Sequence, residues 1–142
     1  MDEHATALAD AIEAVLPGWV ERSVRSRLAN ADPEAIARAG RRAAAEVGAA
    51  LRQLLATDID QQATTPLSLL RGAVRFPTAV LRAAGAPAAE RDEVRARLFP
   101  DDVYDLAPAT FADVDPALAE PGLAWGASKA FAYLQRHGGA RA

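Results

Sequence analysis

A short acidic stretch near residue 100 holds the side chains whose types and spacing are best suited to chemistry. Asp101, Asp102 and Asp105 lie close together in the chain, with Tyr104 between them. Clusters of carboxylate oxygens bind hard cations such as Ca²⁺ or Mg²⁺. Their spacing does not match an EF-hand loop, whose ligands alternate around a central glycine. We therefore favour helix capping or pairing with arginine for these carboxylates over a metal site.

Two arginines, Arg71 and Arg75, are the basic residues that we expect to face this acidic stretch. Residues 22–97 carry thirteen arginines and eight acids, whereas residues 98–135 carry six acids and one lysine. Because opposite charges attract, this division predicts that acids of the later segment pair with helical arginines. The candidate interaction surface consists of Asp101, Asp102, Tyr104, Asp105, Arg71 and Arg75.

Few other residues suit catalysis. The chain has no cysteine, which excludes disulfides, thiolate nucleophiles and cysteine-based metal centres. His4 and His137 lie near the ends of the sequence, where side chains are poorly held. No phosphate-binding glycine loop, nucleophile elbow or His-Glu-x-x-His motif is present. We assign no catalytic residue, metal ligand or cofactor, and we lean towards a protein that is not an enzyme.

Arginines between residues 22 and 42 raise nucleic-acid binding as a minor alternative. The break at residues 30–33 has the length of the turn in a helix-turn-helix motif. However, the next helix opens with Pro33 and Glu34, and an acid at that end repels phosphate. The net charge of the chain is −3, whereas nucleic-acid-binding domains are usually basic.

Apolar spacing of about 3.6 residues dominates the chain and predicts helices rather than strands. We expect Asp32 and Thr65 to start helices, Pro17 to end the first helix, and Pro77 to kink or break a later one. Gly85 is expected to end that helix in the left-handed conformation. The expected helices cover residues 3–16, 17–28, 33–59, 66–85, 87–98 and 121–137.

Two of these helices have distinctive apolar patterns. The helix over residues 33–59 carries a stripe at 4-3-4-3-4 spacing, with Gly40 and Ala43 in its first half, where a neighbouring backbone can approach closely. The helix over residues 121–137 is apolar nearly all round, which is typical of a helix buried on most sides. The stripe consists of Ile36, Gly40, Ala43, Val47, Ala50 and Leu54, and it is widened by Leu51 and Leu55.

The segment Leu98–Trp125 contains four prolines, so it cannot form one helix. It also contains aromatic side chains and is too apolar for a disordered tail. We therefore expect an ordered, irregular segment that packs on the helices and mostly buries Phe99, Phe111 and Trp125. Asp115, which precedes a proline as Asp32 does, is expected to form a cap or turn.

Three stretches of the chain, TPLSLLRGAVRFPTAVLRAAG, FPDDVYDL and GLAWGASKA, are informative together. They resemble an uncharacterised family of small helical actinobacterial proteins, over roughly Thr64 to His137. The resemblance implies an actinobacterial lineage. It implies no activity, and no catalytic residue is carried over from it.

These observations predict a single all-α domain over residues 1–142. We expect a bundle of five to six helices around the last one, with a long ordered irregular segment before it. The acidic start and the absence of a long apolar run indicate a cytoplasmic protein with no membrane partner. We expect a non-enzymatic protein–protein interaction or regulatory domain, with another protein as partner or as a homodimer. The alternative is a small-ligand or divalent-metal-binding domain, with or without enzymatic activity, whose site lies between the irregular segment and the helix of Arg71 and Arg75.

Overall fold

The computed structural model describes residues 3–56, 65–86 and 106–137, and these residues form helices and no strand. The all-α prediction is confirmed for this part of the chain. The predicted helix over residues 87–98 and the first part of the irregular segment lie outside it. In chain order the elements are α1 (Glu3–Arg25), α2 (Pro33–Ala56), α3 (Pro66–Gly72), α4 (Arg75–Ala83), α6 (Phe111–Val114), the 3₁₀ helix η3 (Pro116–Leu118) and α7 (Ala119–His137).

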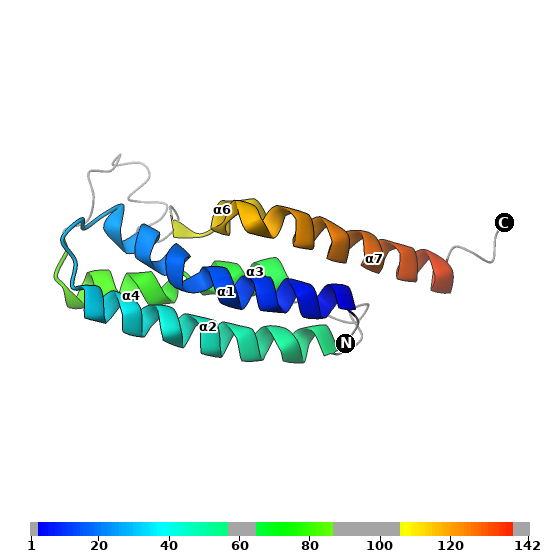
Figure 1. Ribbon diagram of the computed structural model, residues 1–142, viewed down its shortest axis with the longest axis horizontal. Helices are drawn as coiled ribbons and strands as arrows, with labels where there is room; N and C mark the ends of the chain where they lie inside the picture. The colour runs from blue at the N-terminus through cyan, green and yellow to red at the C-terminus, as the bar shows by residue number, and fades with distance from the viewer. Residues whose placement is uncertain (1–2, 57–64, 87–105, 138–142) are drawn as a thin grey trace, which may run out of the picture.

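The helices run along one long direction. α1 and α2 form an antiparallel pair, and α3 and α4 follow one another along it (Figure 1). α1 contacts α2, α4, α6, η3 and α7, so α1 is the central helix of the described structure. α7 begins on the bundle and extends past its end (Figure 1). The prediction that the last helix is central and buried was therefore wrong.

The continuity of α1 through Pro17 corrects the predicted helix end at this residue. A proline inside a helix removes one hydrogen bond and crowds the carbonyl four residues earlier, at a cost of about 3 kcal/mol. Burial of one unbroken apolar face on both sides of the proline offsets this cost. The large buried side chains of α1 are Leu8, Ile12, Leu16, Trp19, Val20 and Val24.

Gly40 of α2 lies directly against Pro17 of α1. A Cβ atom at Gly40 would lie 3.0 Å from the Pro17 Cα and 3.2 Å from its Cβ. Ala43, one turn later, is fully buried. The predicted close helix contact at Gly40 and Ala43 is therefore confirmed. The predicted stripe is wrong at Ala50, which is exposed, whereas Leu51, predicted to widen the stripe, is buried.

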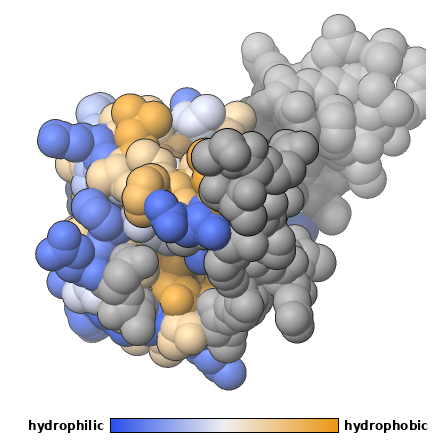
Figure 2. Space-filling model, turned by 90° about the vertical axis from the view of Figure 1, so that its right-hand side faces the viewer, coloured by the Kyte–Doolittle hydropathy of each residue, from blue (hydrophilic) through white to orange (hydrophobic). Residues whose placement is uncertain are grey.

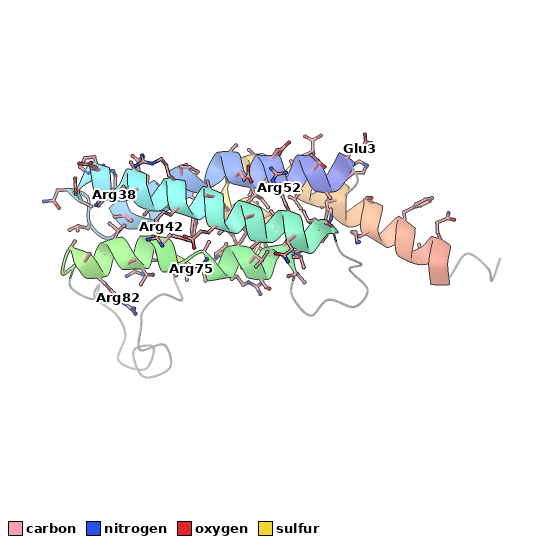
Figure 3. The ribbon with its side chains drawn as sticks, turned by 90° about the horizontal axis from the view of Figure 1, so that it is seen from below. Glu3, Arg38, Arg42, Arg52, Arg75 and Arg82 are labelled. Carbon is pink, nitrogen blue, oxygen red and sulfur yellow. The ribbon has the colours of Figure 1, made fainter. Side chains whose placement is uncertain are left out.

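Arg52 joins the last part of α2 to the first half of α1. Its Nη2 donates to Asp10 Oδ1 at 2.6 Å, and its Nε donates to Glu13 Oε1 at 3.1 Å. Figure 3 shows Arg52 between the two helices. The hydrogen bonds to Glu13 and Asp10 raise the pKa of Arg52 above its ordinary value. The side chain therefore acts as a fixed cation between two carboxylates.

The break between α3 and α4 occurs at Ala73 and Val74, one turn before the predicted position at Pro77. Pro77 lies in the first turn of α4, where backbone N–H groups have no acceptor within the helix, so the absence of an N–H in proline costs no hydrogen bond. Its ring would crowd the carbonyl of Ala73, four residues earlier. That carbonyl instead accepts a hydrogen bond from the Phe76 N–H at 3.1 Å. The proline thus causes the break, but the backbone changes course upstream of it.

Three predicted helix boundaries are confirmed. The Asp32 Oδ1 accepts from the Glu34 N–H at the start of α2, and Thr65 forms a reciprocal cap with Ser68 at the start of α3. Gly85 has a φ of 65°, in the left-handed region that favours glycine. Its N–H donates to the Arg82 carbonyl and the next N–H donates to the Leu81 carbonyl, which is a Schellman ending.

Candidate functional site

The two arginines of the predicted interaction surface do not meet at one site in the described structure. Arg71 Nε donates to the Pro108 carbonyl at 3.1 Å, and its Nη2 donates to the Ala109 carbonyl at 3.4 Å. Arg75 instead lies over the Phe76 ring at 4.5 Å and donates to the Gly72 carbonyl. The remaining predicted members, Asp101, Asp102, Tyr104 and Asp105, lie outside the described residues.

A second arginine, Arg22 of α1, also holds the segment that follows residue 105. Its Nη2 lies 2.8 Å from the Val114 carbonyl and 3.3 Å from Asp115 Oδ2. The charge division along the chain predicted pairs of this kind, but it did not single out Arg22 or Asp115. Arg22 and Arg71 therefore anchor residues 108–115 to two different helices, chiefly through backbone carbonyls.

The acidic residues of this segment that the structure describes act as caps. Asp113 Oδ2 accepts from the N–H groups of Ala109 and Thr110, at 3.0 and 2.9 Å. Asp115 Oδ1 accepts from the Ala117 N–H at 2.8 Å and starts η3, as its position before a proline predicted. Among the described residues, no group of three or more acidic, histidine or cysteine side chains is placed to hold a metal ion.

An open cavity of about 450 Å³ lies between α1 and residues 106–113. The small-ligand alternative drawn from the sequence predicted a site between the irregular segment and the helix of Arg71 and Arg75. This cavity instead lies beside α1. The Ser26 hydroxyl donates to the Ser23 backbone carbonyl, so its proton is not directed at a catalytic base. The described lining residues are Trp19, Arg22, Ser23, Ser26, Leu106, Ala107, Pro108, Ala109 and Asp113.

The arginines of the possible nucleic-acid surface are largely matched by acids. Arg38 lies 3.9 Å from Glu34, and Arg42 lies 3.4 Å from Glu46, each one turn apart on α2. Figure 3 shows Arg38 and Arg42 along this helix. Such pairs lower the positive charge that α2 presents to a polyanion.

The outward side of α7 is the feature that sequence reasoning missed. Leu123, Phe131 and Leu134 are 76%, 64% and 58% exposed, and Ala127 and Ala130, which lie between them in sequence, are also exposed. The sequence pattern was apolar all round and therefore predicted burial on most sides. The end of the molecule toward which α7 extends shows apolar surface among hydrophilic side chains (Figure 2).

The opposite side of α7 attaches the helix to the bundle. Gly122 of α7 and Leu118 of the preceding η3 are buried, and Trp125 of α7 and Phe111 of α6 are partly buried against the core. A Cβ atom at Gly122 would lie 2.6 Å from the Phe111 ring, so this glycine leaves the room that the ring occupies beside the helix. The predicted burial of Phe111 and Trp125 is thus partial, while Phe99 lies outside the described residues.

α7 is not a membrane-spanning helix despite its apolar composition. None of the helices in the described ranges is both long and apolar enough to cross a bilayer.

Comparison of the chain with models of protein families, with curated proteins and with solved structures found no match. The actinobacterial resemblance drawn from the three sequence stretches stays a prediction. Function must accordingly be argued from the surface of this structure.

Proposed function

We propose that this protein is a non-enzymatic interaction domain that binds a protein through the outward side of α7. The observation that carries the proposal is the exposure of Leu123, Phe131 and Leu134 along one helix. Single exposed apolar residues are ordinary, but apolar side chains gathered on one face mark interaction sites. Removing apolar surface from water is favourable by about 25 cal/mol per square ångström before the entropy cost of association is subtracted.

The way α7 is held supports this role. Its first half packs on α1 and η3, and the Phe111 ring lies against Gly122. Arg22 and Arg71 fix the preceding segment to α1 and α3. Because this first part of α7 is already held on one side, Leu123 loses little freedom when a partner binds there, which favours affinity. The cytoplasmic location and the regulatory role expected from the sequence remain part of this proposal.

Site-specific photo-crosslinking in living cells tests the proposal. A photoreactive benzoylphenylalanine replaces Phe131 in one variant and Ala45, an exposed residue of α2, in a control variant. We expect protein adducts at position 131 and few at position 45. Equal adduct yields at the two positions would show that the outward side of α7 is not an interaction surface.

The cavity beside α1 supports a second candidate function, binding of a small polar ligand. Its volume of about 450 Å³ falls within the range of about 300–1,000 Å³ typical of ligand sites. Arg22 and the two serines supply polar groups next to the Trp19 ring. Titration of nucleotides and divalent cations into a Trp125→Phe variant, followed by Trp19 fluorescence, tests this function. A saturable change that Ala107→Leu removes would support it, and a flat titration would exclude these ligands.

A further inference from the structure

We infer that the partner of the outward side of α7 is the same side of α7 in a second copy of this chain, packed antiparallel. This inference deepens the proposed function and rests on it. The face that would pair consists of Leu123, Ala127, Ala130, Phe131 and Leu134.

The spacing of these residues is that of a helix-pairing seam. Leu123, Ala127, Ala130 and Leu134 follow one another at intervals of four, three and four residues. Such spacing keeps side chains in register along two helices that pack at a small angle. Here the seam is solvent-exposed and lies on the side of α7 away from the buried Leu118 and Gly122.

The sizes of the side chains are self-complementary in an antiparallel pair. With the pair centred between residues 128 and 129, Leu123 of each copy meets Leu134 of the other. Ala127 of each copy meets Ala130 of the other at the centre, where two small residues let the helices approach closely. Each Phe131 then lies beside an Ala127 of the partner helix. Large residues thus meet at the ends and small residues at the centre.

Charge selects this orientation over the parallel one. Glu120 is exposed, has a helical position close to the seam, and lies at the start of α7. A parallel pair would bring two Glu120 side chains together and align the two helix dipoles, both of which are unfavourable. An antiparallel pair places the two Glu120 positions about 25 Å apart, at a rise of about 1.5 Å per residue.

Charge also favours α7 over α2 as the contact between copies. The exposed seam of α7 carries no charged residue between Leu123 and Leu134. The exposed side of α2 carries Arg38, Arg41 and Arg42, as well as acids paired with two of them. Pairing through α2 would require these charged groups to be desolvated, which costs free energy that the α7 contact avoids.

The area of the seam predicts a weak, concentration-dependent dimer. Burying the exposed parts of these side chains on two copies removes on the order of 1,000 Å² from water, slightly below the roughly 1,200–2,000 Å² of stable specific interfaces. We therefore expect mostly monomer at about 10 µM and substantial dimer towards about 1 mM.

Disulfide trapping of the full chain tests both the partner and the orientation. Since the chain has no cysteine, Leu123→Cys and Leu134→Cys each introduce a single thiol. In the antiparallel pair these two positions face each other, so a mixture of the two variants should form a mixed disulfide. Either variant alone should form little, because its two thiols would lie about 16 Å apart along the pair. Linkage of each variant to itself at the yield of the mixture would overturn the antiparallel orientation.

Sedimentation velocity of the uncross-linked protein tests self-association directly. We expect the sedimentation coefficient to rise with concentration for the natural sequence and for the control Ala45→Glu, and to stay at the monomer value for Phe131→Glu. A natural sequence that stays monomeric throughout and forms no mixed disulfide would overturn the inference. Photo-adducts at position 131 with a different protein would then leave the proposed function standing, whereas equal adducts at positions 131 and 45 would remove both.

Discussion

Gly40 allows α1 and α2 to approach closely at the point where Pro17 interrupts the hydrogen bonding of α1. The substitution Gly40→Leu would place a side chain where even a Cβ atom lies 3.0 Å from the Pro17 Cα. Overpacking of this kind costs about 1–3 kcal/mol, so we expect a lower free energy of unfolding. Urea denaturation measures it, with Ala45→Leu, an exposed position on the same helix, as the control. Equal stability of the two variants would place Gly40 in water.

Arg52 illustrates how a side chain at the surface joins two helices. Its planar guanidinium reaches Asp10 and Glu13 at once, which the single amine of lysine cannot reproduce. We expect Arg52→Lys to lower the thermal midpoint slightly and added salt to reduce the difference, because exposed ion pairs are screened. A larger difference at high salt than at low salt would contradict this account.

The pKa of Arg52 also fixes how this contact depends on pH. Because its pKa is raised in the folded state, titration of Arg52 itself removes none of its contribution to stability between neutral pH and its ordinary pKa. We therefore expect the difference in stability between the natural sequence and Arg52→Lys to stay constant from neutral to mildly alkaline pH. Thermal denaturation over that range measures this difference.

At the scale of elements, two glycines one turn apart on α7 should respond in opposite ways to alanine. A Cβ atom at Gly122 would meet the Phe111 ring at 2.6 Å, whereas one at Gly126 would meet nothing within 4 Å. We expect Gly122→Ala to loosen α6 from α7 and to destabilise the protein. Gly126→Ala should stabilise it by about 0.5–1 kcal/mol, since alanine favours helix over glycine.

Chemical denaturation at low micromolar concentration, where we expect monomer, compares the two glycine variants. Each serves as the matched control of the other, because both change the same residue type on the same helix. Destabilisation by both would indicate that Gly126 also has a close neighbour. Stabilisation by both would mean that the Phe111 ring moves aside at little cost.

Across the whole molecule, the free energy of local opening should decrease from α1 towards the C-terminal end of α7. α1 is covered by helices on several sides, whereas the seam of α7 is exposed. Amide groups in elements with few buried contacts exchange by local opening. Hydrogen exchange measured by mass spectrometry should therefore be slow over α1 and fast over the last turns of α7. Uniform protection of both helices in dilute solution would contradict this gradient.

The sequence by itself determined the helical fold and several helix boundaries. Asp32, Thr65, Asp115 and Gly85 do what their types predicted because caps and left-handed endings depend on atoms within a few residues of the cap. The close contact at Gly40 was also predictable, because a small residue in an apolar stripe leaves room for a neighbouring backbone.

Tertiary structure decided the rest of the fold and the whole of the candidate site. α1 continues through Pro17 because packing on both sides of the proline outweighs the lost hydrogen bond. Arg22 pairs with Asp115, which lies more than ninety residues later in the sequence. The apolar pattern of α7 indicated that the helix has apolar surface to bury, but it did not indicate which other surface would cover it. A pattern reports only which side chains avoid water, whereas the position of every other helix decides which of them remain exposed, as Phe131 does.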